Sequence, residues 1–574
     1  MKYMGRSNIN RLIIALSFLS AVTQCHTTKS QEAAAYNYSA ADSIAKPVVA
    51  ASPAQAGGPE LPRFYLDTSY NPSTREPKLV AAGSNLQAAI NAAQPGDVLT
   101  LQAGATFTGN FNLPAKPGSG WITIRSAAPD SSLPAPGKRI TPDYANVLPK
   151  IVSPNSDPAL IAKPGAHHYR FIGVEFTVGP KVAQNYNLIY LGDGETSTGQ
   201  LSHDLIFDRV YIHGNPNVNL RRGIALNAAA TAVIDSYISD IHEIGADAQA
   251  LAVWNGPGPF KIVNNYLEAS GDNFLAGGAI PTIPNLIPSD IEFQRNHCFK
   301  PLTWKVGEPN YAGKHWQVKN HFELKNSQRV LVNGNTFENN WLDAQVGFAI
   351  LFTVRTEDGN AAWAVVNDVT FTNNILRHSG SGINISGSDE APAIGDSRRI
   401  RIANNLFEDI NGPRWGEADG RWLQIIAGPD EVIVEHNTVF QTGTLVYADG
   451  DPPCQGFVFR NNLAPHNAYG FFGSGVGSGT EALNRYFPGA VFKKNVIIGG
   501  TAKDYPPDNL FPATMDEIRF VDREKGNYRL SALSRYRKNG TDSKDIGVDF
   551  GALTATMSEG TPNDTKGDLK ALDK

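Results

Sequence analysis

Three charged residues stand out because their types and order suit proton abstraction beside a carboxylate. Glu323 and Lys325 lie two residues apart in one strand-like segment, and Arg355 ends the next such segment. A lysine can act as a base when neighbouring cations and partial burial lower its pKa. An arginine stays protonated and can hold a carboxylate through two parallel N–H groups. Lys325 as base and Arg355 as carboxylate partner would together support β-elimination from a uronic acid.

Further polar side chains are expected on the same outer surface as Lys325. Every second residue of a strand points outward, and neighbouring strands lie about 4.8 Å apart. Trp254 offers an aromatic face to a sugar ring, and His315 lies in a cation-rich insertion at 301–321. A second insertion, 277–290, flanks the same segments. The candidates for substrate binding are Glu323, Asn384, Gln424, Trp254 and His315.

Each of these residues also has a structural interpretation. The acid, the lysine and the arginine form a surface ion-pair ladder if they bind nothing, and such pairs contribute little to stability. Most of the tryptophans between Trp254 and Trp422 are expected to pack in a core. His315 and His321 are alternative bases, or structural histidines.

Composition limits the kind of molecule that positions these residues. The chain has 574 residues, of which 41% are hydrophobic and 18% are charged. That length exceeds a single compact core, so the chain is either several domains or one elongated array. The net charge of −5 and the lack of a basic block argue against binding to nucleic acid. Three cysteines cannot build a disulfide framework.

A repeat organises the chain and favours the elongated array. Two apolar residues spaced by two are followed, three positions later, by an asparagine, and this pattern recurs about every 32 residues. Earlier and weaker copies place Val174, Val210 and Tyr237 at the asparagine position. Asparagine tolerates the left-handed conformation of a tight bend, and stacked amides can bond from coil to coil. The repeated asparagines are Asn265, Asn296, Asn335, Asn374, Asn405, Asn437, Asn462 and Asn495.

The apolar residues of each repeat alternate with period two, which predicts strands rather than helices. Two or three short strands in each repeat make a parallel β-helix, a solenoid whose coils stack on one another. We therefore predict an all-β, right-handed parallel β-helix over residues 61–552. An amphipathic segment at 85–93 is predicted to be a helix that caps its N-terminal end.

The two ends of the chain lack the repeat and have a different composition. Residues 1–25 combine three basic residues with a short apolar run, as a secretory signal does. Residues 26–60 are predicted to be a flexible linker, and 553–574 a disordered tail. The protein is expected to be secreted, periplasmic or in the cell envelope, with a lipid anchor at Cys25 left open. No membrane span is predicted after the signal, and a monomer is expected.

Two stretches carry a resemblance to a known superfamily. The sequence LQAAINAAQPGDVLTLQAGATFTG at 86–109 resembles the opening of right-handed β-helix proteins of the pectate-lyase-like superfamily. The sequence GNYRLSALSRYRKNGTDSKDIGVDF at 526–550 is similar to their terminal coil. The resemblance covers about residues 80–552 and implies the fold. It leaves the activity open, because the superfamily includes lyases, hydrolases, esterases, epimerases and adhesins.

A shorter stretch resembles one group of lyases within that superfamily. ELKNSQRVLVNGNTF at 323–337, followed by AILFTVR at 349–355, has the residue order of chondroitinase B and the alginate lyases. Asn326 stands where that group has serine, and the stretch from lysine to arginine is longer. Only Glu323 matches the paired glutamates that bind calcium there, so no metal site is predicted and a role for Ca²⁺ stays open.

The function best supported by the sequence is a secreted, polysaccharide-active lyase that cleaves a uronic-acid polymer by β-elimination. One alternative is a glycoside hydrolase with paired carboxylates. The sequence lacks the adjacent Asp-Asp pair that marks β-helical polygalacturonases. A non-catalytic glycan-binding or adhesin β-helix is the other alternative. The carboxylates available to a hydrolase are Asp272, Asp343, Glu357 and Asp358.

Overall fold

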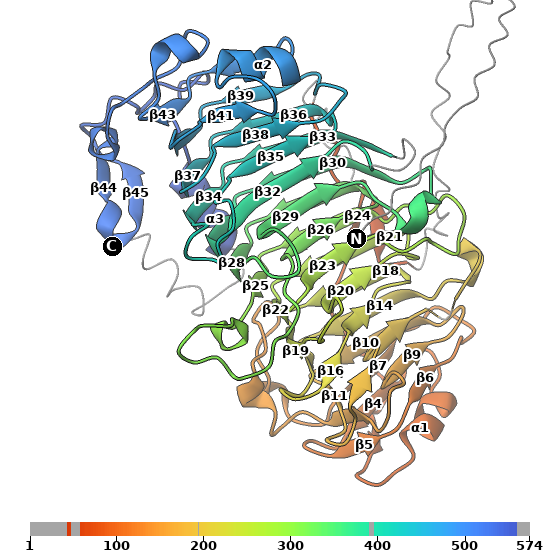
Figure 1. The fold of residues 1–574 in the computed structure, drawn as a ribbon. Helices are drawn as coiled ribbons and strands as arrows, with labels where there is room; N and C mark the ends of the chain where they lie inside the picture. The colour runs from red at the N-terminus through yellow and green to blue at the C-terminus, as the bar shows by residue number, and fades with distance from the viewer. Residues whose placement is uncertain (1–42, 48–57, 193, 390–394, 559–574) are drawn as a thin grey trace, which may run out of the picture. The chain divides into compact units, whose positions relative to one another are not determined.

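The computed structural model describes residues 43–47, 58–192, 194–389 and 395–558. All of them belong to one compact unit, Tyr36–Lys574. The predicted signal segment at 1–25 lies outside the described residues. Three long sheets of 14, 13 and 12 strands account for most of the unit, and every pairing within them is parallel. Each coil adds one strand to each sheet, so the predicted all-β, right-handed parallel β-helix is confirmed (Figure 1).

The 14-stranded sheet receives the first strand of each coil. Its strands are β3 Lys78–Val80, β4 Val98–Leu101, β7 Ile122–Ser126, β10 His167–Ile172, β14 His203–Asp208, β18 Ala229–Ile234, β21 Gly258–Val263, β24 Ser289–Gln294, β27 Ser327–Asn333, β30 Val365–Thr372, β33 Asp396–Ala403, β36 Asp430–Glu435, β39 Val458–Arg460 and β42 Val491–Lys493.

The 13-stranded sheet follows it along the chain. Its strands are β5 Thr106–Thr108, β8 Lys150–Ser153, β11 Glu175–Val178, β15 Tyr211–His213, β19 Tyr237–Ile241, β22 Tyr266–Ala269, β25 His297–Phe299, β28 Thr336–Asn340, β31 Ile375–Ser379, β34 Leu406–Ile410, β37 Thr438–Gln441, β40 Leu463–Pro465 and β43 Val496–Ile498.

The 12-stranded sheet completes each coil. Its strands are β6 Phe111–Leu113, β9 Leu160–Ala162, β13 Ile189–Leu191, β17 Arg222–Ala225, β20 Gln249–Val253, β23 Asp272–Ala276, β26 Phe322–Leu324, β29 Phe348–Thr353, β32 Ser381–Ser386, β35 Leu423–Ile426, β38 Val446–Asp449 and β41 Phe471–Gly473.

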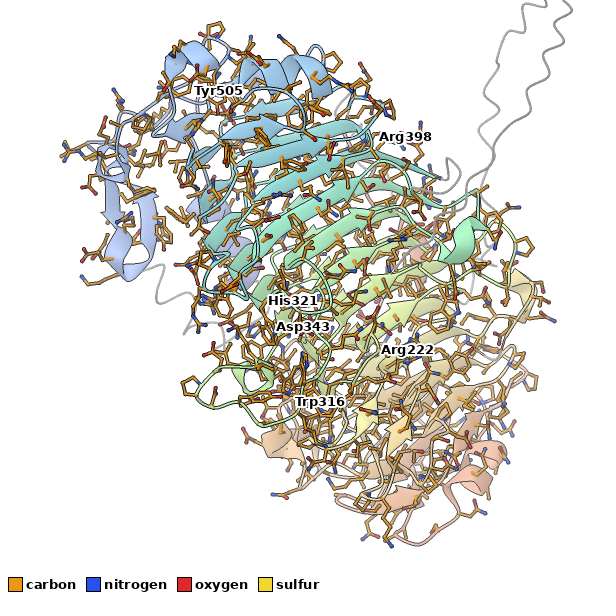
Figure 2. All side chains as sticks on the ribbon, in the orientation of Figure 1. Arg222, Trp316, His321, Asp343, Arg398 and Tyr505 are labelled. Carbon is orange, nitrogen blue, oxygen red and sulfur yellow. The ribbon has the colours of Figure 1, made fainter. Side chains whose placement is uncertain are left out.

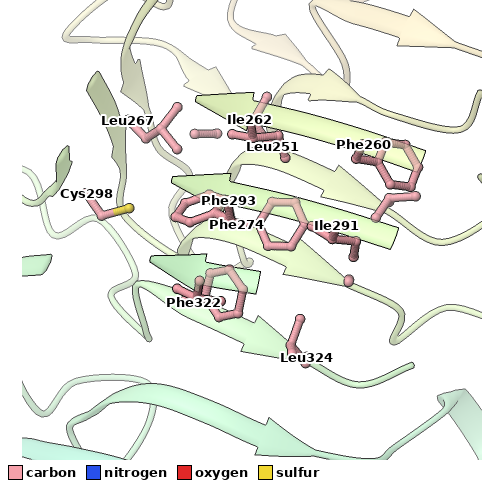
Figure 3. Close-up of a cluster of buried hydrophobic side chains, with 14 of the residues drawn as sticks. Leu251, Phe260, Ile262, Leu267, Phe274, Ile291, Phe293, Cys298, Phe322 and Leu324 are labelled. Atoms are coloured by element: carbon pink, nitrogen blue, oxygen red, sulfur yellow. The ribbon is translucent and has the colours of Figure 1, made fainter. Parts of the chain in front are cut away.

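The inward side chains of the three sheets form one continuous core. Alternation along the strands produces it, because Phe322 and Leu324 of β26 point inward while Glu323 between them points outward. Phe274 and Phe322 stack on adjacent coils with ring centroids 5.1 Å apart. Figure 3 shows these rings between the sheets, with the buried Cys298 at one side. The ladder of stacked rings fixes the register, since a one-residue slip would turn the apolar set outward.

The bend between the 14- and 13-stranded sheets holds the asparagine ladder. From β10 onward, two residues separate the strands of these sheets in every coil. The second of the two is the ladder residue, and its side-chain oxygen accepts bonds from the previous coil. The backbone N–H and the Nδ2 of Asn265 donate to Asn296 Oδ1 at 2.9 and 3.0 Å. The ladder ends at Asn509, one step beyond the predicted repeats. The predicted coil-to-coil bonding is confirmed.

Two details of the predicted bend are wrong. The left-handed backbone belongs to the residue before the ladder asparagine, as at Asn264 (φ 58°) and Asn373 (φ 55°). This residue turns the chain, and the next side chain then points inward to form the ladder. In the copy before Asn265, the ladder position is Ser236, whose N–H donates to Asn265 Oδ1 at 2.9 Å. Tyr237 is instead the first residue of β19.

A strap, defined as residues 43–47 and 58–70, lies across the outer face of the 14-stranded sheet. Its strands β1 (Ala45–Pro47) and β2 (Phe64–Leu66) pair antiparallel. Ile44, Ala45 and Leu66 pack on apolar side chains of β14, β18 and β21. The predicted flexible linker at 26–60 thus includes a paired strand, and its residues 26–42 and 48–57 lie outside the described residues.

The ends of the β-helix carry the helices. α1 (Leu86–Ala92) lies against β6 and buries Leu86 and Ile90, with Asn85 as its N-cap. α2 (Thr480–Tyr486) lies against β41 at the other end. β44 (Phe520–Asp522) and β45 (Asn527–Leu530) form an antiparallel pair, and α3 (Phe550–Ser558) packs on the 13-stranded sheet beside Ile375 and Leu406. The segment predicted as a disordered tail from 553 therefore begins within a helix.

Candidate functional site

The outer face of the 12-stranded sheet carries a row of side chains that the strand register aligns. Glu323 of β26 pairs with Leu351 of β29 in the strand register. Leu351 pairs in turn with Asn384 of β32, and Asn384 pairs with Gln424 of β35. The structure thus places three predicted binding residues in one row along the axis. Leu351 interrupts the row, because it points outward between Glu323 and Asn384 but is almost completely buried.

Lys325 lies directly beside Glu323. It follows the last residue of β26, and its Nζ is 3.4 Å from Glu323 Oε1. Its side chain is 18% exposed. Gly278 (φ +92°) lies against the lysine stem, and a Cβ at this position would come within 3.2 Å of Lys325 Cδ. The insertion 277–290 therefore approaches Lys325 through a glycine and leaves the amine at the surface of the sheet.

Arg355 occupies the coil after Lys325. Its backbone N–H donates to Lys325 O at 3.0 Å, so the two residues are neighbours across adjacent coils. Its side chain is 66% exposed, and Nε is 3.7 Å from Asp389 Oδ1. A long contact to a single carboxylate oxygen leaves the planar face and the other N–H groups of this guanidinium open to solvent. The predicted base and its predicted carboxylate partner thus lie on adjacent coils at the same edge of the 12-stranded sheet.

A second lysine, Lys319, lies among three carboxylates beneath this row. Its Nζ is 2.7 Å from Asp247 Oδ2 and 3.5 Å from Glu323 Oε2. Asn320 Nδ2 bridges Asp272 Oδ1 and Glu323 Oε2, both at 3.2 Å. Lys319 was only one of several cations in the 301–321 insertion when judged from the sequence. Its role depends on a loop conformation that no sequence pattern encodes.

Burial and neighbouring charges shift the pKa values of this cluster in opposite directions. Burial alone would lower the pKa of Lys319, but the surrounding carboxylates outweigh it and raise the pKa well above its usual range. Burial raises the pKa of Asp272 to about 6, against the opposing attraction of Lys319. Among the described residues, Asp272 Oδ2 has no hydrogen-bond partner, which is consistent with a carboxyl group that is easily protonated.

The cluster does not fit the calcium site of the lyases that the sequence resembles. Calcium takes six to eight oxygen ligands, whereas here an ammonium group lies among Asp247, Asp272 and Glu323. Lys319 already occupies the centre of the cluster with a positive charge that offsets part of the negative charge of these carboxylates. A calcium ion added to them would be repelled by Lys319.

Lys300 supports the same loop from inside the molecule. Its side chain is fully buried, and its Nζ lies 2.8–3.1 Å from four backbone carbonyl oxygens, which share its three N–H donors. Three of these carbonyls belong to the bend before β23, and the fourth is Asn320 O. Lys300 therefore ties the bend before β23 to the segment that presents Lys319 and Asn320. Buried ammonium groups need this degree of hydrogen bonding to persist.

Some of the tryptophans are partly exposed on the outside of the β-helix, and others are buried. Trp254 follows β20, is half-buried, and has the Arg222 guanidinium 4.9 Å above its ring. Burial lowers the pKa of Arg222 to about 10. Trp316 belongs instead to a buried cluster with Trp304, Trp341 and Trp415, as expected of most tryptophans here. Figure 2 labels Arg222 and Trp316 on the coils that precede β26.

The two candidate histidines differ in their exposure. His315 is 62% exposed, and its Nε2 lies 2.6 Å from Asp343 Oδ1, a residue labelled in Figure 2. His321 is fully buried, with Nδ1 2.7 Å from Asn273 Oδ1. Burial lowers the pKa of His321 well below its usual value. No substrate reaches a ring in the core, so His321 as an alternative base is wrong.

The row continues beyond the predicted residues. Gln424 Nε2 donates to Asn384 Oδ1 at 3.1 Å, and Arg421 donates to Gln424 Oε1 at 2.6 Å. The next position is Tyr447, whose ring lies 4.2 Å from the Arg421 guanidinium carbon. Phe472 follows Tyr447 in the same register. The signal for these residues was present, because β38 and β41 obey the same alternation as β35.

The carboxylates proposed for a hydrolase do not gather as a pair on this row. Asp272 is fully buried beneath it, and Asp343 is engaged by His315. Glu357 follows β29 at the start of a short turn, where its N–H donates to Gly278 O at 2.8 Å. The side chain of Asp358 lies outside the described residues. Among the described acids, only Glu323 points outward from a strand of the row between β23 and β35.

A large groove of about 1950 Å³ lies elsewhere, between the strap, the C-terminal segment and β27 to β39 of the 14-stranded sheet. Two of its arginines share one acid, because Arg401 and Arg460 both pair with Glu435, at 2.7 and 2.8 Å. Size alone would favour this groove. The outer face of the 12-stranded sheet is better suited to the predicted chemistry because Lys325 and Arg355 lie there on adjacent coils, each with a long contact to one carboxylate.

Comparison with known proteins found matches among solved structures only. No protein-family model matches the chain, and no curated protein matches it. Among solved structures, an alginate lyase from Paenibacillus sp. str. FPU-7 is 14% identical with a TM-score of 0.29, covering 70% of this chain and 96% of that chain. The PL6 family alginate lyase AlyGC is 14% identical with a TM-score of 0.42, covering 82% of this chain and 57% of that chain.

A third structure in the same comparison is a hydrolase. The catalytic unit of the GH87 alpha-1,3-glucanase from Streptomyces thermodiastaticus is 12% identical with a TM-score of 0.33, covering 79% of this chain and 73% of that chain. Such low identities and TM-scores carry no inference about activity, substrate or site residues. Within the described part of the chain, no helix has the length and apolar character required to span a bilayer.

Proposed function

We propose that this protein is a secreted polysaccharide lyase that cleaves a uronic-acid-containing polymer on the outer face of its 12-stranded sheet. The observation that supports this most is the juxtaposition of Lys325 and Arg355 on adjacent coils, with the Arg355 side chain largely exposed. Asn384 and Gln424 extend the same row and position the sugar units, and Glu323, which is buried, contacts Lys325. Trp254 and His315 line the approach to it from the preceding coils.

In the proposed reaction, Lys325 Nζ removes the proton from the carbon that carries the uronate carboxyl group. The electron pair of that C–H bond forms a carbon–carbon double bond, and the glycosidic oxygen leaves the next carbon with a proton from water. Arg355 binds the carboxylate and stabilises the charge that develops on it. Lys325 then returns the abstracted proton to the hydroxide left by that water, so the products are an unsaturated sugar end and a new hydroxyl end, and no water is consumed.

Two lysines with different surroundings make this assignment chemically reasonable. Lys325 must be neutral to act as a base, and its Nζ lies 3.4 Å from Glu323 Oε1. Lys319 remains charged among the carboxylates, so Glu323 keeps a counter-cation when Lys325 is neutral. The uronate of the substrate then meets Arg355 rather than the buried acids.

The proposed function is tested with a panel of anionic and neutral polysaccharides. We expect at least one anionic polymer to yield the absorbance of unsaturated ends. Lys325→Ala should reduce turnover of that polymer by about 10²- to 10⁴-fold, the usual contribution of positioned proton transfer. The matched control is Lys261→Ala, because Lys261 lies on the outer face of the 14-stranded sheet and donates to Leu66 O of the strap. It should retain wild-type turnover.

Other outcomes lead to other assignments. New reducing ends without that absorbance would replace the lyase with a hydrolase. Binding without any cleavage would indicate a glycan-binding β-helix. A normal rate in Lys325→Ala would remove this residue from the chemistry, whichever polymer is cleaved.

A further inference from the structure

A cluster of histidines lies at the start of two strands of the 14-stranded sheet, several coils before the proposed lyase site. His167 and His168 begin β10, and His203 and Asp204 begin β14 on the next coil. His167 pairs with His203 in the strand register, and their rings stack with centroids 4.9 Å apart. His168 (φ 57°) and Asp204 (φ 53°) are left-handed residues that bulge from the sheet. The bulge directs both side chains toward the same point under the strap.

The nitrogen and oxygen atoms of this cluster are close enough to share an ion. One ligating atom from each of His168, His203 and Asp204 lies within 4.8 Å of the other two. Among the described residues, this is the one set of three histidine, cysteine or acidic side chains that converge so closely. His203 Nδ1 lies 2.6 Å from Asp204 Oδ2. His168 and Asp204 are buried, whereas a quarter of the His203 side chain is exposed, which leaves a path from solvent.

The fourth member of the cluster orients the ligands. His167 Nδ1 lies 2.7 Å from His168 Nδ1, so one of these nitrogens carries a proton and the other accepts it. That contact fixes the orientation of the His168 ring, as partners of metal-binding histidines generally do.

The remaining oxygen of Asp204 holds the strap. Ser43 Oγ and the Ile44 N–H donate to Asp204 Oδ1 at 2.9 and 2.8 Å. Asp204 Oδ2 therefore faces the histidines while Oδ1 faces the strap. A ligand on Oδ2 would order the carboxylate and, through Oδ1, the strap.

We propose that His168, His203 and Asp204 form a structural site for a divalent transition metal, with Zn²⁺ as its natural occupant, and that the bound ion fastens the strap to the β-helix. Two imidazoles and one carboxylate are a donor set that suits Zn²⁺, whereas Ca²⁺ and Mg²⁺ prefer oxygen ligands only. At bond lengths of about 2.0–2.2 Å, the ligating atoms would draw closer together, and the ion would replace the His203–Asp204 contact. This inference does not depend on the proposed lyase activity.

The test uses the full-length protein, stripped of metal with a chelator and titrated with Zn²⁺. We expect one equivalent to bind, and Co²⁺ in its place to give the visible bands of a four-coordinate nitrogen and oxygen site. His168→Ala and His203→Ala should each weaken Zn²⁺ binding at least tenfold, because each removes one of three protein ligands. Ca²⁺ at the same concentration should neither bind nor compete.

A matched control and a second readout separate a built site from surface histidines. His378 is also a left-handed residue (φ 59°), and its Nδ1 lies 3.1 Å from Asp409 Oδ2, but no second histidine joins this pair in the set of converging ligands. His378→Ala should bind Zn²⁺ like the wild type. Zn²⁺ should also slow hydrogen exchange of the Ile44 amide in the wild type and in His378→Ala, but not in His203→Ala.

Three results would overturn the proposal. They are binding of less than half an equivalent, equal affinity in the wild type and both histidine variants, and Ile44 exchange that does not respond to Zn²⁺. Asp204→Asn keeps an oxygen for the strap but loses the charged ligand, so it should weaken Zn²⁺ binding even if an alanine variant fails to fold.

Discussion

The outer faces of the 14- and 12-stranded sheets are both built from parallel strands, but the strap covers part of the first face and not the second. On the 14-stranded sheet, the strap covers the strands and takes up their polar groups. Arg63 N–H donates to Asp290 Oδ1 at 2.7 Å, and Glu60 N–H donates to Asp368 Oδ1 at 3.0 Å. On the 12-stranded sheet, the insertions 277–290 and 301–321 flank the strands. Gln424 stays partly exposed between them, whereas Glu323 is buried beside Lys319 and Lys325.

The ion pairs of the covered face are shorter than those of the open face and involve both carboxylate oxygens. On the covered face, Arg329 binds both oxygens of Asp290 at 2.8 and 3.0 Å, and Arg399 binds both oxygens of Asp368 in the same way. On the open face, the contacts of Lys325 and Arg355 are single, at 3.4 and 3.7 Å. Short two-point pairs hold the fold together and have little capacity left for a ligand. Loose pairs are the ones that a substrate carboxylate can displace.

The largest expected effect is on stability and belongs to the covered face. Asp290→Ala leaves the Arg329 guanidinium buried without its partner and removes the acceptor of the Arg63 N–H. Removal of one member of a buried pair costs about 3–5 kcal/mol. Urea unfolding should show this loss, while turnover per folded molecule stays at the wild-type level. A drop in turnover at full folding would show that the covered face contributes to the chemistry.

The next effect concerns pH and the acid beneath the open face. The folded pKa of Asp272, about 6, lies above its unfolded value, so the folded state holds an extra proton between these pH values. Its stabilising contribution is therefore present below about pH 4 and is lost as the pH rises through 6. Asp272→Asn should abolish a change on the order of 2–3 kcal/mol in the free energy of unfolding across that window. An unchanged pH profile in chemical denaturation would place the acid in contact with water.

A smaller effect is expected when arginine is replaced by lysine, and it should differ between Arg355 on the open face and Arg329 on the covered face. Arg355→Lys should lower kcat/KM by about 10- to 100-fold, because an ammonium group cannot grip a carboxylate at two points. Arg329→Lys is its counterpart on the covered face, and it should lower stability without changing kcat/KM. Steady-state kinetics and thermal unfolding of both variants give the comparison. Equal kinetics for the two variants would remove Arg355 from the site.

The smallest effect is expected at the far end of the row. Gln424→Ala removes one neutral hydrogen bond, worth about 0.5–1.5 kcal/mol, so KM should rise by about 2- to 10-fold while kcat is kept. Gln328→Ala, which loses a bond to Ser289 on the 14-stranded sheet, serves as the control. A change in kcat rather than KM would contradict a role in positioning alone.

Much of the fold was accessible from the sequence because it depends on local and periodic signals. The asparagine ladder and the alternation in each strand repeat often enough to outweigh their weaker copies. The error at Tyr237 arose where Ser236 takes the ladder position with a shorter side chain. Serine offers the same hydrogen bond without the amide that defines the pattern.

The site was less accessible for a physical reason. Alternation within a strand placed Glu323 and Gln424 on one row, and the register agrees. The cluster around Lys319 is formed by a long insertion, and its shape depends on the buried Lys300 and on carbonyls from another coil. The sequence did not predict the strap, because Ser43 and Ile44 bind an acid about 160 positions away, Asp204. Contacts of that span leave no periodic trace.

The two-residue bend at the asparagine ladder also limits how such a protein can change its length. An added residue there would put the next strand out of phase with its neighbours and break an amide bond to the coils on both sides. The other two corners have no such constraint, and one of them holds the 301–321 insertion. Evolution and protein engineering can therefore graft new segments beside the open face, while the ladder keeps the coils in phase.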